Sequence, residues 1–143
     1  MMNEDNLKLK NAILSCTGTE NSLAEVYSLL EGPKLVHTFL DSKDKWFYHD
    51  GLSWIETTNE ALQRQMSTKM HKVYTNTAQT LLMGAIGDEN TMLVVDHLKK
   101  TADKLSANKR FQQSVVKELR EYVNDNEFYT RLFSALPVDY RTR

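Results

Sequence analysis

The sequence predicts an α+β fold that is mostly helical: a helical bundle with one small antiparallel β-hairpin or sheet. Three observations favour this class. Apolar residues recur at helical spacing over most of the chain. Two β-prone segments flank Asp50-Gly51, and the 5 glycines and 2 prolines are too few for an all-β sandwich with many tight turns. Because 41% of the 143 residues are apolar, we expect a single domain over residues 1–143, with 1–20 as an N-terminal helix or extension.

Two helices are expected before any strand signal. Residues 6 to 16 carry leucine and isoleucine in an imperfect helical stripe. A second helix should run from residue 22 to residue 31, since Ser22 and Glu25 have the spacing of a capping box. In that motif the hydroxyl and the carboxylate satisfy free amides of the first turn. Gly32-Pro33 predicts the end of this helix, because both residue types interrupt a helix.

The residues that follow favour a small sheet. Residues 35 to 40 alternate in a way that suits a short strand. Residues 46 to 49 and 52 to 55 are rich in aromatic and apolar side chains, and Asp50-Gly51 separates them. An Asp-Gly pair adopts the two positive φ angles of a type I′ turn at little steric cost, so we predict a β-hairpin with a two-residue turn.

Four helices are expected after the hairpin. The first opens at a capping box of Thr57 and Glu60 and runs to about residue 74, or to residue 82 if the following segment extends it. Gly84 and Gly87 indicate a break. The remaining helices are expected over residues 92 to 106, 109 to 124 and 126 to 134, with Asn108 and Asp125 as N-caps of the last two.

The sequence gives little support to enzymatic chemistry. None of the five glycines is followed by lysine, so the Gly-Lys-Ser/Thr ending of a phosphate loop is absent. The histidines, which are His37, His49, His71 and His97, lie in separate expected elements and lack the spacing of a metal site. We therefore expect no catalytic residue, no metal and no cofactor. A small enzyme that brings His49 and Asp50 together with other side chains in a cleft remains an alternative.

Cysteine content and hydropathy indicate an intracellular protein. The single cysteine, Cys16, excludes an internal disulfide and suits a reducing compartment such as the cytoplasm or the nucleus. The N-terminus carries acids where a secretory signal carries bases. The longest apolar stretches fall well short of the ~20 residues that cross a bilayer, so no membrane association is expected.

Charge is unevenly distributed along the chain. Residues 1–60 hold 5 Lys/Arg against 10 Asp/Glu, whereas residues 61–120 hold 10 against 5. A basic surface attracts phosphates by releasing their counterions. Seven basic residues of the late helices are therefore candidate phosphate contacts: Lys99, Lys100, Lys104, Lys109, Arg110, Lys117 and Arg120. Lys69 and Lys72 are lesser candidates, and an ordinary solvated helix face is the alternative interpretation.

Three aromatic residues near the hairpin raise a second binding hypothesis. Exposed aromatics on strands can stack on unpaired bases, which would suit Trp46, Tyr48 and Trp54. However, Trp46 and Tyr48 are two residues apart and share one face of a strand, and the flanking helices need such a face to pack against. We therefore expect these side chains to belong mainly to the core, with one of them partly exposed.

The order of these segments resembles the domain just upstream of the superfamily III helicase core in poxvirus-type and other large-DNA-virus primase-helicases and in related phage primases. The resemblance covers about residues 20 to 135. It rests on Ser22-Leu23-Ala24-Glu25-Val26-Tyr27, on Lys45-Trp46-Phe47-Tyr48-His49-Asp50-Gly51-Leu52-Ser53-Trp54, on the Leu62/Met66/Met70/Tyr74 helix, and on Asn124-Asp125-Asn126-Glu127-Phe128. The family usually continues with an Asp-Ser-Asn-Pro-like stretch, where this chain instead reads Phe133-Ser134-Ala135-Leu136-Pro137.

The resemblance implies a non-catalytic accessory domain of a viral or phage replication protein. Such a domain would contact an adjacent helicase domain and neighbouring subunits, aid ring assembly, and bind single- or double-stranded DNA weakly and without sequence preference. The chain would then be either an excised part of a longer primase-helicase or a stand-alone relative. The alternative is a protein–protein interaction module of a replication complex that makes no contact with nucleic acid.

Overall fold

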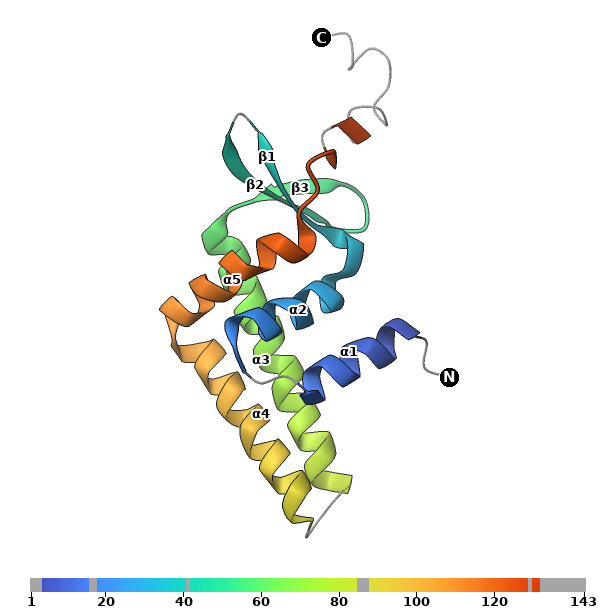
Figure 1. Cartoon of the computed structure of the whole chain (residues 1–143), viewed down its shortest axis with the longest axis vertical. Coiled ribbons are helices and arrows are strands. Elements are labelled where there is room, and N and C mark those ends of the chain that lie inside the picture. The colour runs from blue at the N-terminus through green and yellow to red at the C-terminus, as the bar shows by residue number, and fades with distance from the viewer. Residues whose placement is uncertain (1–3, 16–17, 41, 85–87, 129, 132–143) are drawn as a thin grey trace.

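The computed structural model describes residues 4–15, 18–40, 42–84, 88–128 and 130–131. The elements, in chain order, are α1 (Glu4–Ser15), α2 (Glu20–Glu31), the short 3-10 turn η1 (Gly32–Lys34), β1 (Leu35–Leu40), β2 (Lys43–His49), β3 (Trp54–Thr57), α3 (Asn59–Gly84), α4 (Glu89–Ala107) and α5 (Lys109–Val123). The expected class, mostly helical α+β with a small antiparallel sheet, is confirmed (Figure 1).

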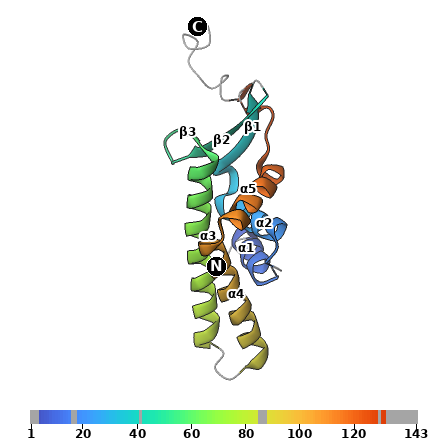
Figure 2. The same ribbon diagram turned by 90° about the vertical axis from the view of Figure 1, so that its left-hand side faces the viewer.

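Helices α3 and α4 form a long antiparallel pair that runs along the molecule, and the sheet lies at the end where α3 begins (Figures 1 and 2). Helices α2 and α5 pack against each other between the sheet and the far end of this pair, and α1 packs on α2. In the part of the chain that the structure describes, no helix combines the length and the apolar character needed to cross a membrane.

The core follows the apolar stripes that the sequence predicts for the late helices. Leu62, Met66 and Met70 of α3 are fully buried, as are Leu98 and Leu105 of α4. On α5, Phe111, Val115 and Leu119 recur at helical spacing and are buried. Tyr122, the next position of this stripe, is exposed instead, and its hydroxyl donates a hydrogen bond to Asn21 Oδ1 at 2.8 Å. It lies at the edge of the apolar stripe, where a phenol can keep its polar end in water.

The two faces of the sheet pack against different parts of the chain. Trp46 pairs with His37 across β1 and β2 and is buried with the helices, and its indole N–H donates to Asn59 Oδ1 at 2.7 Å. Phe47, one residue later, points to the other face and stacks on Phe128. Core packing of Trp46 is therefore confirmed, while Trp54 is half-buried against Phe128.

The predicted hairpin is present, but its turn differs from the prediction. His49 pairs with Trp54, so residues 50–53 form a four-residue turn. Gly51 has a positive φ of 101°, but Asp50 does not. Its carboxylate instead accepts hydrogen bonds from the amides of Leu52 and Ser53, both at 2.8 Å, and these bonds hold the pKa of Asp50 below its usual value. The side chain thus closes the turn in place of a type I′ backbone, and Leu52 is exposed at the tip.

Several helix boundaries also differ from the prediction. Neither expected capping box forms: Thr19 caps α2 and accepts from the Ser22 amide, and Thr58 accepts from the Ala61 amide at the start of α3. In both cases an earlier or neighbouring threonine fits the N-cap position, because the first turn needs an acceptor directly before it. Asn108 caps α5 as predicted, with Oδ1 accepting from the Phe111 amide at 3.0 Å.

The remaining boundaries extend the expected helices. Helix α3 continues as one helix to Gly84, so residues 75 to 82 do extend it. Helix α4 begins at Glu89, three positions before the expected start, because Asp88 caps it through the amides of Asn90 and Thr91. Asp125 Oδ1 accepts from the Glu127 amide, and of the helix expected over residues 126 to 134, residues 128, 130 and 131 are helical. Residues 129 and 132–134 of that helix, along with Gly87 and Cys16, lie outside the described residues.

Replacement of Trp46 tests how far the sheet depends on its inner face. Trp46→Ala removes a side chain that is 1% exposed together with its bond to Asn59, so the free energy of unfolding should fall by about 3 to 5 kcal/mol. Leu52→Ala, at a side chain that is 92% exposed, is the control and should change it by less than about 0.5 kcal/mol. Urea unfolding of both variants measures the difference, and equal stability of the two would show that the inner face contributes little.

Candidate functional site

The structure does not gather the nine predicted phosphate contacts into one continuous strip. Three of them are paired with acids: Lys69 Nζ lies 2.8 Å from Glu31 Oε1, Lys100 Nζ lies 3.0 Å from Asp96 Oδ2, and Arg120 Nη2 lies 3.0 Å from Asp44 Oδ2. Lys104 Nζ lies 4.1 Å from the centre of the Phe111 ring. These four cations are therefore less available to a ligand than a count along the sequence suggests.

Of the three paired cations, Lys69 has the most buried acid partner. Its partner Glu31 has a side chain that is only 5% exposed, and a buried carboxylate needs a counter-ion. Burial, reinforced by the negative charge of Glu31, raises the pKa of the neighbouring Tyr27 phenol above its usual value. The ammonium also lies 5.7 Å from the centre of the Tyr48 ring. Lys69 thus neutralises an inward-facing acid between α2, α3 and the sheet.

Helix geometry separates other members of the predicted set. At 100° per residue, Lys99 and Lys104 are about 140° apart around α4 and so point to different flanks. Lys72 is exposed on α3, three residues after Lys69. It lies on the same flank of α3 as Lys69, and the contact of Lys69 with Glu31 shows that this flank faces α2. Lys99 and Lys104 therefore cannot both border the basic residues of α5, and Lys104 is the one that contacts the start of α5, through the Phe111 ring.

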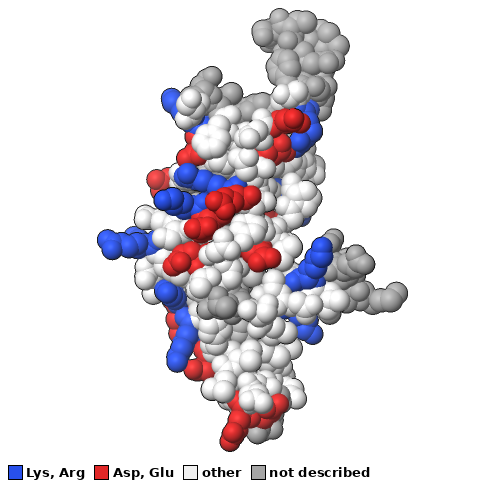
Figure 3. All heavy atoms as spheres, in the orientation of Figure 1, with Lys and Arg blue, Asp and Glu red and all other residues white. Residues whose placement is uncertain are grey.

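The basic residues of α5 do share one side of their helix. Lys109 and Arg120 are eleven residues apart, and Arg110 and Lys117 are seven apart. The two members of each pair therefore lie within about 20° of each other around the helix axis. We call Lys109, Arg110 and Lys117 the α5 basic stripe. Within the described ranges, none of the three has a carboxylate at ion-pair distance. Glu118 accepts a hydrogen bond from Asn21 on the α2 side of α5, and Figure 3 shows acidic side chains directly beside basic ones on this face of the molecule.

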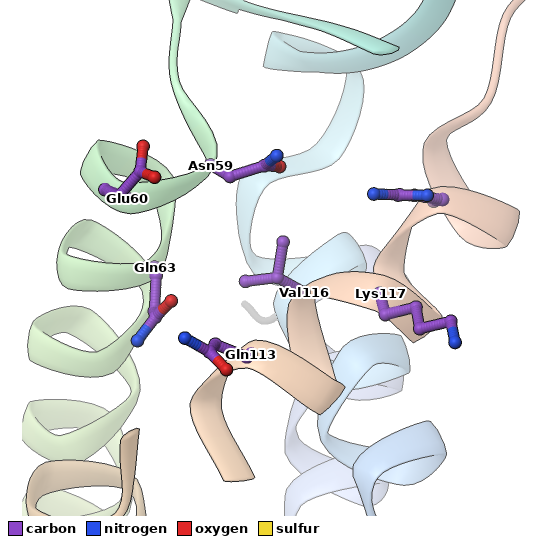
Figure 4. A pocket seen from close by; sticks show the side chains of 7 residues that line it. Asn59, Glu60, Gln63, Gln113, Val116 and Lys117 are labelled. Atoms are coloured by element: carbon purple, nitrogen blue, oxygen red, sulfur yellow. The ribbon is translucent and has the colours of Figure 1, made fainter. Parts of the chain in front are cut away.

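A groove runs beside the α5 basic stripe, between α5 and the start of α3. It has a volume of about 320 Å³ and is lined by Asn59, Glu60, Gln63, Gln113, Val116, Lys117 and Arg120. Figure 4 shows the α3 side chains on one wall and those of α5 on the other, with Lys117 extending away from α3. The lining thus combines amide donors and acceptors, an apolar floor at Val116, one acid at Glu60 and two cations.

Hydrogen bonds hold both walls of the groove in place. Gln63 Nε2 donates to Gln112 Oε1 at 2.9 Å and joins α3 to α5. Asn59 is fixed by the indole of Trp46. The side chain of Arg120 is held by Asp44, and Asp44 Oδ1 in turn lies 2.8 Å from His37 Nε2. A site with restrained side chains loses little conformational entropy when it binds a ligand.

The side-chain contacts from His37 to Asp44 and from Asp44 to Arg120 also join the sheet to the end of α5. His37 is buried, and its Nδ1 lies 3.0 Å from Asn124 Nδ2, so the amide donates and Nε2–H donates to Asp44. The carbonyl of His37 accepts from the Asp125 amide at 2.8 Å. Because every polar atom of this imidazole has a partner, its position fits a structural histidine, and the arrangement orients Arg120 toward the groove.

At the hairpin, the side chains of His49 and Asp50 form hydrogen bonds within the turn itself. His49 Nδ1 accepts from the Gly51 amide at 3.0 Å, and Asp50 is occupied by two amides of the same turn. Among the described residues, no group of three or more His, Cys, Asp or Glu side chains is placed to hold a metal ion.

Two of the groove residues, Lys117 and Arg120, are among the contacts predicted from the sequence, and the other five were missed. A signal for part of the site was present, because Gln113, Val116, Lys117 and Arg120 recur at helical spacing along one edge of the apolar stripe of α5. The α3 wall had no such signal. Asn59 and Gln63 reach the groove only because α3 crosses α5.

A double-mutant cycle tests whether Asp44 and Arg120 act as a pair. We expect Asp44→Ala and Arg120→Ala to show a coupling of about 0.5 to 3 kcal/mol in urea unfolding, since the pair is partly shielded from water and linked to His37. The matched control is the exposed pair Asp96 and Lys100, for which the same cycle should give about 0.3 to 0.5 kcal/mol. Strict additivity at Asp44 and Arg120 would contradict a role for the pair in holding α5.

Comparisons with protein-family models, with curated proteins and with solved structures find no match for this chain. The resemblance of residues 20 to 135 to a helicase-associated domain therefore gains no support from them.

Proposed function

We propose that this chain is a non-catalytic accessory domain that contacts the phosphate backbone of DNA through the α5 basic stripe and the groove beside it. The observation that carries the proposal is the placement of Lys109, Arg110 and Lys117 on one side of α5, exposed and without a carboxylate at ion-pair distance in the described part of the chain. Three such cations on one rigid helix can follow a phosphate chain, because each contact releases a condensed counterion.

The chemistry of the site sets the character of the binding. Lysine supplies a charge without reading base edges, so contacts of this kind are largely independent of sequence. With three to four cations, the affinity should be modest and should fall steeply with salt. Glu60 and the acids beside the stripe limit the attraction further, since a like charge near a phosphate opposes binding.

The biological setting that we propose is a viral or phage primase-helicase. Its support is the residue pattern over residues 20 to 135 described above. In that setting the domain would pack against an adjacent helicase domain and neighbouring subunits and guide DNA toward them. The hydrogen-bonded walls of the groove suit such a role, because a guide must keep its shape as DNA moves past it.

Oligonucleotide binding at two salt concentrations tests the proposal. We expect labelled single- and double-stranded oligonucleotides of unrelated sequence to show raised fluorescence anisotropy with the full chain at low salt, and the signal to decline as salt increases. Absence of binding at low salt would overturn the proposal.

Charge-matched variants test the assignment of the site. Lys109→Ser, Arg110→Ser and Lys117→Ser together should weaken binding and reduce the slope of log affinity against log salt by about 2 for a single strand, at about 0.7 per lost contact. Lys8→Ser, Lys10→Ser and Lys34→Ser remove the same charge from exposed positions elsewhere and should leave most of the affinity. Arg120 is left unchanged because it also holds Asp44. Equal losses in the two triple variants would show that net charge, and not the α5 basic stripe, governs binding.

A further inference from the structure

The first turns of α4 carry apolar side chains on two faces. Met92, Leu93, Val94 and Val95 are consecutive, and a helix cannot direct four consecutive residues to one side. Val95 is buried in the core, whereas Met92 is 41% exposed and Leu93 is 69% exposed. A surface helix normally carries polar residues opposite its core-facing stripe, so exposed apolar residues there indicate a contact with something outside the described chain.

These side chains form part of a shallow hollow. Glu89, Met92, Leu93 and Asp96 line a volume of about 520 Å³ on the outer side of α4. Met83, which is 81% exposed, lies at the end of α3, and Figures 1 and 2 show that this end of α3 and the start of α4 lie together. Methionine side chains are flexible and polarisable, which lets such a surface adapt to a partner.

Acidic residues lie beside the apolar centre where α4 begins. Asp88 and Glu89 begin the helix, and Figure 3 shows acidic side chains at this lower end of the molecule. Hydrogen bonds from Thr91 and from the amides of the first turn hold the pKa of Asp88 below its usual value, so it is ionised at neutral pH. On the other side of the apolar centre Asp96 is paired with Lys100 at 3.0 Å, and Lys99 is also exposed there, so the negative charge of this surface is concentrated at the start of α4.

We propose that this outer face of α4, formed by Glu89, Met92, Leu93 and Asp96, binds a basic amphipathic helix of another protein. The partner helix would place leucine-like side chains on Met92 and Leu93 and its lysine or arginine residues beside Asp88 and Glu89 at the start of α4. The charge of the surface decides between occupants, since like-charge repulsion opposes an acidic helix or a nucleic acid at this position. This proposal does not depend on DNA binding, because the α5 basic stripe belongs to a different helix.

A synthetic peptide pair tests the proposal on the full chain. One peptide is an amphipathic helix with leucine on one face and lysine on the other, and the second carries glutamate in place of every lysine. In ¹⁵N–¹H spectra, the lysine peptide should shift amides of residues 89–96, and the glutamate peptide should not. Binding of both peptides alike, or shifts centred on α5, would overturn the proposed site.

Substitutions at the site and at control positions separate specific binding from non-specific hydrophobic binding. Met92→Gln with Leu93→Gln should lower the affinity for the lysine peptide by about tenfold. Leu7→Gln with Leu52→Gln, at two exposed leucines elsewhere, should leave this affinity unchanged. Glu89→Gln should also weaken binding and make it less sensitive to salt. An affinity that survives Met92→Gln with Leu93→Gln contradicts the proposal.

Two further measurements identify the occupant of this face and separate it from the α5 basic stripe. If the wild-type chain self-associates in sedimentation and Met92→Gln with Leu93→Gln makes it monomeric, the occupant is a second copy and the proposed partner is wrong. Oligonucleotide affinity should be the same in this variant as in the wild type, and the lysine peptide should still bind when Lys109, Arg110 and Lys117 are replaced by serine. The two proposals can therefore fail separately.

Discussion

The packing of α3 is the constraint on which the rest of the structure depends. Its buried stripe, from Leu62 through Met70 to Ala78, is a single surface more than four turns long. Helix α4 packs along it, α5 crosses it near its start, and the inner face of the sheet is tied to it through Trp46 and Asn59. A shorter or broken α3 would remove buried side chains from the core that α4 and the inner face of the sheet share.

Long-range ion pairs engage two cations of the basic half of the chain. Acids of α2 and β2 reach the cations of α3 and α5, as Glu31 does with Lys69 and Asp44 with Arg120. Glu31 is buried and costly to leave without a partner, and Asp44 is partly exposed but also contacts the buried His37, so these pairings serve the fold first. The cations left for a ligand are those that face away from the acidic elements, and on α5 they form one stripe.

The molecule presents two surfaces of opposite character on neighbouring helices. The α5 basic stripe borders a hydrogen-bonded groove near the sheet, and the outer face of α4 is apolar with acidic edges near the far end of α3. Under the two proposals, a ligand rich in phosphate would be attracted to the first surface and repelled by the second. This separation suits a protein that connects two different partners, and it keeps each contact independent of the other.

Local chemistry decided much of the fold, and the sequence alone determined that part. Gly32-Pro33 ends a helix, Asn108 caps another, and Asp50-Gly51 marks the hairpin, because the cause in each case lies within a few residues of its effect. Local errors were of the same kind: the threonine that caps α2 or α3 lies close in sequence to the expected residue, and the side chain of Asp50 replaced the expected backbone turn.

Only the tertiary structure decided which charged and apolar residues are available to a ligand. Lys69 and Glu31 are 38 positions apart, Gln63 and Gln112 are 49 apart, and His37 and Asn124 are 87 apart. Helical periodicity shows which side of its own helix a residue occupies, but it carries no information about which other element covers that side. The exposure of Leu93 and the pairing of Arg120 therefore follow from how helices and strands cross, which is set by the packing of the whole core.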